Sequence, residues 1–116
     1  MDRLTRREDF LAARNGRSEA LPGVVMQLRL RGDGNPPRSG FTATKKLGNA
    51  VMRNRIKRRL KEAARLTLPG IAQAGADYVL IGRQASATRD FELIRNDIRA
   101  AVKRLHGPAK GGPDRG

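Results

Sequence analysis

Residues 45–65 (KKLGNAVMRNRIKRRLKEAAR) form the segment that most constrains the fold. Asn49 is a typical helix N-cap, and apolar residues follow it at helical spacing. This apolar stripe consists of Val51 or Met52, Ile56, Leu60, Ala63 and Ala64. The pattern predicts a long amphipathic helix, ended by the Leu68-Pro69-Gly70 stretch, whose stripe other elements must cover.

The elements expected around this helix alternate between helix and strand. Capping by Thr5, with Glu8 three residues later, predicts a first helix over 5–14, stopped where Gly16 adopts a left-handed conformation. Strands are expected over 24–30 and 39–45, joined by the turn at 32–37, with Gly40 marking a bulge or a close approach. A buried strand over 76–82 and a helix from about Thr88 or Asp90 to His106 complete the chain.

This order predicts an α+β fold, a two-layer α/β sandwich with elements α-β-β(-β)-α-β-α. Residues 1–106 are expected to form a single domain, because no repeat or second core is visible. Residues 107–116 (GPAKGGPDRG) have the composition of a disordered tail.

The charge of the whole chain restricts its partners. Its 116 residues carry a formal net charge of +14 at pH 7, which favours binding to nucleic acid or to an anionic membrane surface. Aromatic residues make up only 3%, which argues against a surface built mainly on base stacking. The chain has no cysteine, the first ten residues do not resemble a signal peptide, and the longest apolar run, 78–81, is far too short to span a bilayer. We therefore expect a soluble, cytoplasmic protein.

Enzyme chemistry carried by the protein itself is not indicated. The eleven acidic residues are scattered over helix starts, turns and the tail, whereas a two-metal nuclease needs several carboxylates at one site. The single histidine, His106, lies at a helix end, where a cation favours the helix dipole. We predict no catalytic residue, no metal site and no protein-bound cofactor.

The basic residues of the 45–65 segment are the better functional candidate. Nine of them stand against the single acid Glu62: Lys45, Lys46, Arg53, Arg55, Lys57, Arg58, Arg59, Lys61 and Arg65. Arginine holds phosphate oxygens in a planar fork, and the first turn of a helix adds free backbone N–H groups. A solvated helix face is the alternative interpretation. The ordered run of a Lys pair, a Gly-Asn break and Arg-Asn-Arg favours a phosphate-binding surface.

With these residues noted, the chain resembles the protein subunit of bacterial ribonuclease P. The matching motif is Lys45-Lys46, then Gly48-Asn49-Ala50-Val51, then Arg53-Asn54-Arg55. The flanks agree, with Glu8-Asp9-Phe10 in the first helix, residues 40–44 (GFTAT) in a strand and a late apolar strand at 78–81. The resemblance spans most of residues 3–105.

The resemblance implies a ribonucleoprotein endonuclease that removes the 5′ leader of precursor tRNA and leaves a 5′-phosphate. The RNA subunit is then the catalyst and holds Mg²⁺. The protein binds that RNA and the precursor, with no membrane or small-molecule partner. The implied RNA-contacting residues are Lys45, Lys46, Asn49, Arg53, Asn54, Arg55, Lys57, Arg58 and Arg59. The family fold also implies a mixed sheet with a left-handed βαβ crossover, opposite to the general rule.

The resemblance further implies a cleft for the leader between the sheet and the first helix. Its expected residues are Phe10, Arg14, Gln27 and Phe41. Arg14 stands where the family often has a second aromatic residue, and Gln27 stands near a common strand aromatic. Leader binding here should therefore rely more on charge and hydrogen bonds. By pattern alone, Phe10 and Phe41 are also expected in the core.

Two other classes of function stay open from the sequence. The same basic helix would suit a ribosomal protein or another protein that binds structured RNA. An autonomous metal nuclease is the third possibility, although no cluster of carboxylates supports it.

Overall fold

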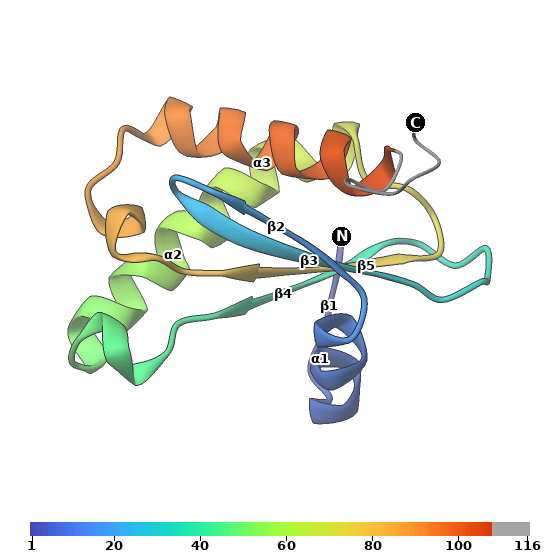
Figure 1. Cartoon of the computed structure of the whole chain (residues 1–116), viewed down its shortest axis with the longest axis horizontal. Helices are drawn as coiled ribbons and strands as arrows, with labels where there is room; N and C mark the ends of the chain where they lie inside the picture. Colours follow the sequence, from blue (N-terminus) through green and yellow to red (C-terminus); the bar gives the residue numbers. More distant parts are fainter. Residues whose placement is uncertain (108–116) are drawn as a thin grey trace, which may run out of the picture.

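The computed structural model describes residues 1–107. In chain order the elements are β1 (Asp2–Arg3), α1 (Arg7–Arg14), β2 (Arg17–Leu21), β3 (Val24–Leu30), β4 (Arg38–Thr42), η1 (Lys45–Leu47), α2 (Ala50–Thr67), η2 (Leu68–Gly70), β5 (Ala76–Ile81), η3 (Gln84–Ala87) and α3 (Phe91–His106), where η marks a short 3₁₀ turn. The five strands form one sheet in the order β1-β4-β5-β3-β2 (Figure 1).

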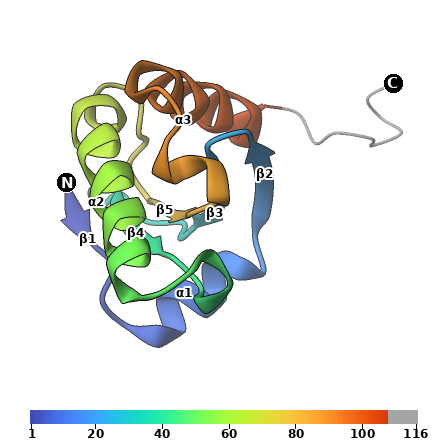
Figure 2. The same ribbon diagram turned by 90° about the vertical axis from the view of Figure 1, so that its left-hand side faces the viewer.

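The sheet is mixed, as expected. Strand β4 pairs in parallel with both β1 and β5, whereas β3 is antiparallel to β5 and to β2. Because β4 and β5 are parallel neighbours, α2 serves as the crossover between them. The crossover runs in the left-handed sense (Figures 1 and 2), against the usual preference for the right hand.

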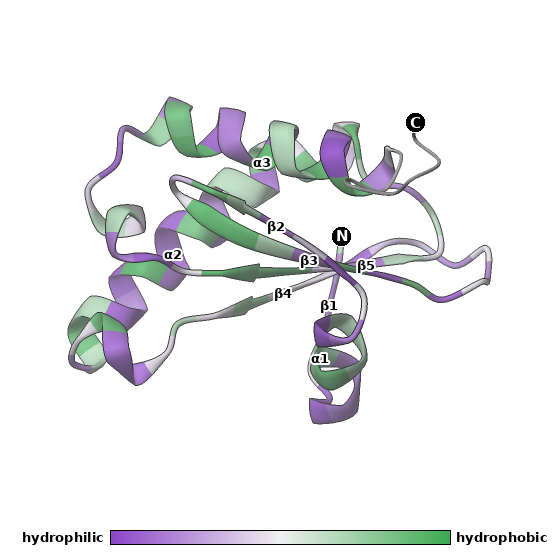
Figure 3. Cartoon of the chain, viewed as in Figure 1, coloured by the Kyte–Doolittle hydropathy of each residue, from purple (hydrophilic) through white to green (hydrophobic). Residues whose placement is uncertain are grey.

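The main core lies between the sheet and the two long helices, α2 and α3. The strands contribute Val24, Met26, Leu28, Tyr78 and Leu80, and the helices contribute Ile56, Leu60, Ile94, Ile98 and Leu105. Figure 3 shows hydrophobic residues concentrated on β3 and β5. The predicted stripe of α2 is confirmed for Ile56, Leu60, Ala63 and Ala64, while Met52 is partly buried and Val51 is 76% exposed.

Helix α1 packs on the opposite face of the sheet (Figure 2). Leu4, Ala13 and Val79 are buried there, with Phe10 and Ile81 packed against them. Gly40 permits this contact, because a Cβ at that position would lie 2.6 Å from the Phe10 ring. The predicted close approach at Gly40 is therefore confirmed, and strand β5 is covered on both faces as expected.

An ion-pair network fastens α1 to the sheet. The buried Asp77 carboxylate accepts hydrogen bonds from Arg38 Nε (2.8 Å) and from Arg31, while Asp9 of α1 pairs with Arg29 at 3.1 Å and with Arg38 at 3.5 Å. Burial alone would raise the pKa of Asp77, but the hydrogen bonds from Arg38 and Arg31 outweigh it and hold that pKa below its usual value. Asp77 is therefore ionised in the folded protein at neutral pH.

Several local expectations are wrong. Helix α1 begins at Arg7, and its N-cap position is Arg6 without a side-chain cap, so Thr5 is not the cap. Gly16 does not have a positive φ; instead it lets the backbone pass β3, since a Cβ there would lie 2.0 Å from the Leu28 carbonyl oxygen. The second strand ends at Thr42, and the chain turns into η1.

The two ends of the chain also differ from the expectation. Strands β1 and β2 form the edges of the sheet and were not predicted. The expected disordered tail at 107–116 lies outside the described residues except for Gly107. The carbonyl of Gly107 accepts a hydrogen bond from Arg17 of β2 at 2.7 Å, so that residue belongs to the end of α3.

Candidate nucleic-acid interface

The first turn of α2 is built as the sequence predicts. The Asn49 side chain accepts a hydrogen bond from the backbone N–H of Met52 at 2.9 Å, which confirms it as the N-cap. Gly48 precedes it with φ of 128°, a conformation that strongly favours glycine. This turn sets Lys45 and Lys46 of η1 beside the positive end of the α2 dipole.

The predicted RNA-contacting residues lie on η1, on its link to α2 and on the first ten residues of α2, but they differ in exposure. Six of them are exposed: Lys45, Lys46, Asn49, Asn54, Arg55 and Arg58. Arg53, Lys57 and Arg59 are half-buried. Arg53 Nε donates to the Gly48 carbonyl at 3.2 Å, which holds that side chain over the helix start. We call these nine predicted residues, exposed and half-buried together, the basic helix surface.

Two members of the basic helix surface also have a structural contact. Arg55 Nε donates to the Ala87 carbonyl at 3.0 Å, and Arg59 donates to the Ser86 carbonyl at 2.8 Å. Both bonds tie α2 to η3, some thirty residues along the chain. Arg55 thus also has a structural contact, which the sequence did not predict, and its terminal nitrogens take no part in this bond.

A cleft runs along the α1 face of the sheet. It has a volume of about 390 Å³ and is lined by Arg7, Phe10, Leu11, Arg14, Gln27, Thr42, Thr44, Val79 and Ile81. The structure thus brings together Phe10, Arg14 and Gln27, three of the four residues predicted for a leader cleft. We call this hollow the α1 cleft.

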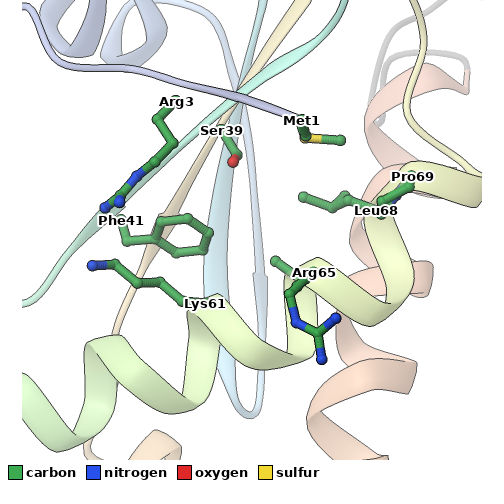
Figure 4. Close-up of a pocket in the computed structure, with 9 residues that line it drawn as sticks. Met1, Arg3, Ser39, Phe41, Lys61, Arg65, Leu68 and Pro69 are labelled. Atoms are coloured by element: carbon green, nitrogen blue, oxygen red, sulfur yellow. The ribbon is translucent and has the colours of Figure 1, made fainter.

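Phe41 lies on the other side of the sheet. Successive side chains of a strand alternate between faces, so Gly40 and Thr42 face α1 whereas Phe41 packs against the core beneath α2. The prediction of Phe41 in the α1 cleft is wrong for this reason. Phe41 lines a second cavity, between β1, β4 and α2, together with Arg3 and Lys61 (Figure 4).

The α1 cleft contains residues that the sequence reasoning missed. Arg7 and Leu11 precede Phe10 and Arg14 by one helical turn or less, so helical spacing points to them once Phe10 is chosen. Thr42, Val79 and Ile81 belong to the strand face opposite the main core. Only the strand pairing, with Thr42 beside Ile81, shows that they meet.

The α1 cleft and the basic helix surface are continuous. Thr44 lines the cleft and is followed directly by Lys45 and Lys46 at the start of η1. Arg7 and Arg14 give the cleft itself a positive charge. An extended polyanion lying in the cleft would therefore meet further cations where it leaves.

His106 and the acidic side chains are the remaining groups that could carry chemistry. Within residues 1–107, no three acidic or histidine side chains come together in a way that could hold a metal ion. His106 forms a 2.7 Å hydrogen bond with the Tyr78 hydroxyl, and burial, followed by the charge of Arg17, lowers the pKa of His106. At neutral pH it is thus an uncharged partner of Tyr78, contrary to the expected helix-end cation. Over the same residues, no helix has the length and apolar character needed to cross a membrane.

These features define a class: small, strongly basic α+β proteins with a positively charged helix next to a cleft on the sheet. Comparison with known proteins narrows it further. The family model "Ribonuclease P" matches residues 1–106. The chain belongs to the ribonuclease P protein family.

Relatives and solved structures agree with this assignment. The "Ribonuclease P protein component" of Ruegeria pomeroyi is 48% identical over 108 residues, covering 90% of this chain and 86% of the relative. That of Caulobacter vibrioides is 47% identical over 102 residues, covering 87% and 68%. The RNase P protein from Thermotoga maritima superposes with a TM-score of 0.75 at 30% identity, covering 92% of this chain and all of that one.

Proposed function

We propose that this chain is the protein subunit of a ribonuclease P ribonucleoprotein. It binds the catalytic RNA through the basic helix surface and the 5′ leader of precursor tRNA in the α1 cleft, and so promotes removal of the leader. The observation that carries the proposal is the continuity of the two sites at Thr44 and Lys45. One protein can thereby hold substrate and catalytic RNA side by side.

The basic helix surface suits a structured RNA. Lys45, Lys46 and Arg58 are exposed, and Arg53 is held over the helix start by its bond to Gly48. Free N–H groups and the helix dipole add attraction for phosphate at the same place. Asn54, between two arginines, adds a neutral donor and acceptor for a base edge or a ribose hydroxyl.

The α1 cleft suits a single strand of RNA. Phe10 offers a ring for one base, while Arg7 and Arg14 lie where phosphates on either side would pass. Gln27, on the floor of the cleft, supplies an amide that can pair with a base edge. This combination supports leader binding by charge and hydrogen bonding with one stacking contact.

Catalysis is assigned to the RNA partner. The protein contributes to an endoribonuclease as a subunit, and the Mg²⁺ needed for cleavage is assigned to the RNA subunit. A cytoplasmic ribonucleoprotein fits a basic chain without cysteine.

The test is precursor tRNA cleavage by the catalytic RNA at low Mg²⁺, with and without this protein. We expect the protein to lower the Mg²⁺ concentration needed for cleavage, and the protein alone to cleave nothing. RNA binding without any gain in cleavage would instead identify a general structured-RNA binder. Cleavage by purified protein without RNA would overturn the assignment of catalysis.

The leader site has a separate test. Arg14→Ala should weaken binding of precursor tRNA to the reconstituted complex but leave binding of mature tRNA, which lacks the leader, unchanged. Lys103→Ala on the exposed face of α3 is the matched control, since it removes one positive charge far from the cleft. An equal loss for precursor and mature tRNA would place Arg14 outside leader binding.

A further inference from the structure

A second cavity lies on the face of the sheet away from the α1 cleft. It has a volume of about 190 Å³ and opens between the β1–β4 edge and the C-terminal half of α2 (Figure 4). Its lining residues are Met1, Arg3, Ser39, Phe41, Lys61, Ala64, Arg65, Leu68 and Pro69. We call it the β1–α2 pocket. None of its residues belongs to either site described above as part of the proposed function.

The β1–α2 pocket combines an aromatic wall with positive charge. Figure 4 shows the Phe41 ring between Ser39 and Lys61, with Arg3 at the rim. Arg65 is paired with Glu62, its Nε lying 3.0 Å from Oε1. By contrast, no hydrogen bond or ion pair within residues 1–107 holds the side chain of Arg3 or of Lys61.

Among the described residues, no acidic side chain forms an ion pair with Lys61. Burial, and then the positive charges of Arg3 and Lys57, lower the pKa of the Lys61 ammonium. Asp2 does not compensate, because strand alternation turns it to the other face, beside Arg38. An anion placed between Arg3 and Lys61 would relieve this repulsion.

The size of the β1–α2 pocket and its position beside α2 indicate what kind of ligand it could hold. A cavity of about 150 Å³ accepts benzene, so the β1–α2 pocket holds one aromatic ring system and not two stacked bases. Arg53, Lys57 and Lys61 form an i, i+4 row with steps of about 6 Å along α2. This row leads from the basic helix surface to the mouth of the pocket.

We propose that the β1–α2 pocket binds one unpaired nucleotide of the RNA that lies on α2. Its base packs against Phe41, and its phosphate lies between Arg3 and Lys61. The Ser39 hydroxyl, which faces the cavity, is available for a hydrogen bond to the base or the ribose. The proposal rests on the proposed RNA binding and adds recognition of a bulged or flipped residue to it.

The test compares two RNA hairpins with equal numbers of phosphates, one fully paired and one with a single unpaired adenine in its stem. Because a base stacked on an aromatic ring is bound roughly fivefold or more tightly, the wild-type full chain should prefer the bulged hairpin by at least about fivefold. Phe41→Leu keeps the apolar bulk and should reduce the preference to within about twofold, as expected from loss of stacking. Binding of the paired hairpin should be unchanged.

A second variant is needed because Phe41→Leu could lose the preference through a folding defect. R3Q combined with K61Q alters only the rim of the pocket and should also remove the preference, while Lys103→Gln should not. The proposal is overturned if both pocket variants keep the wild-type preference, if wild type binds both hairpins equally, or if Phe10→Leu alone removes it. The last result would locate the nucleotide in the α1 cleft. Failure of both hairpins to bind would instead overturn the RNA-binding function itself.

Discussion

Asp77 is a buried carboxylate that holds together the arginines at one end of the sheet. Its side chain is 0% exposed and contacts three arginines, Arg29, Arg31 and Arg38. Removing one partner of a buried ion pair costs up to about 3–5 kcal/mol, although here the three arginines keep Asp9 and Asp33 as more exposed partners. We expect Asp77→Asn to lower the free energy of unfolding by that amount, measured by urea denaturation.

The matched control is Asp33→Asn. Asp33 pairs with Arg31 at 3.0 Å but is 39% exposed, and exposed pairs contribute little to stability because solvent screens them. Since the pKa of Asp77 is lowered in the folded state, its stabilisation is complete above the unfolded value of about 3.9 and is lost as pH falls below it. Asp77→Asn should therefore flatten the acid side of the stability profile. Equal losses in the two variants would mean that burial is not what makes Asp77 important.

Arg58 and Arg59 are neighbours in the sequence, but within residues 1–107 only Arg59 forms a hydrogen bond to another part of the fold. Arg59 donates to the carbonyl of Ser86, a fully buried residue, whereas Arg58 is exposed. Leaving a buried carbonyl unsatisfied costs about 1–3 kcal/mol, so Arg59→Ala should reduce stability by that amount and Arg58→Ala by less than about 0.5 kcal/mol. Thermal unfolding of the two variants measures this. Similar stability would show that the bond to η3 is dispensable.

At the scale of elements, α2 depends on its cap and on its stripe in separable ways. Asn49→Ala removes the bond to the Met52 N–H and should cost about 0.5–2 kcal/mol. Ile56→Ala leaves a cavity under the fully buried centre of the helix and should cost about 2–5 kcal/mol. Val51→Ala, at an exposed position of the same helix, is the control. A larger loss for Asn49→Ala than for Ile56→Ala, in urea denaturation, would contradict this ranking.

Strong periodicity made some elements predictable. Helices α2 and α3 and strands β3 and β5 each bury a continuous apolar stripe or run, so the sequence alone places them. Strand β2 (RSEAL) is an edge strand whose inward-facing positions include the charged Arg17 and Glu19, and β1 has only two residues. Neither carries a pattern of its own, because pairing with β3 and β4 is what makes them strands.

The candidate site was predictable only in part. The order of Lys45, Asn49 and Arg53 predicts a capped basic helix, since the cap and the charge are local properties. Phe41 could not be placed, because helices cover both faces of β4 and alternation alone does not say which face α1 takes. The bond of Arg59 to Ser86 depends on a loop far along the chain, and nothing local indicates it.

For the whole molecule, the charge of +14 is divided between arginines in ion pairs that stabilise the fold and the basic side chains proposed to bind RNA. Around Asp77 and Asp97, arginines are matched by buried carboxylates and stabilise the fold. Along α2, by contrast, basic residues greatly outnumber acidic ones, and Glu62 is the single acid. Affinity for RNA should therefore depend on salt mainly through one face of the protein, although the charge is a property of the entire chain.

This division predicts the salt dependence of RNA binding. If about six cations of the α2 side meet phosphates, log K should fall with log salt at a slope near −4 to −5. Arg53→Ala combined with Arg58→Ala should reduce the size of that slope by about 2, because each lost phosphate contact releases one counterion fewer. Lys103→Ala should leave the slope unchanged, although it removes a positive charge. Filter binding of the catalytic RNA at four or more salt concentrations measures both. Equal slopes for the double variant and the wild type would mean that the RNA does not contact the start of α2.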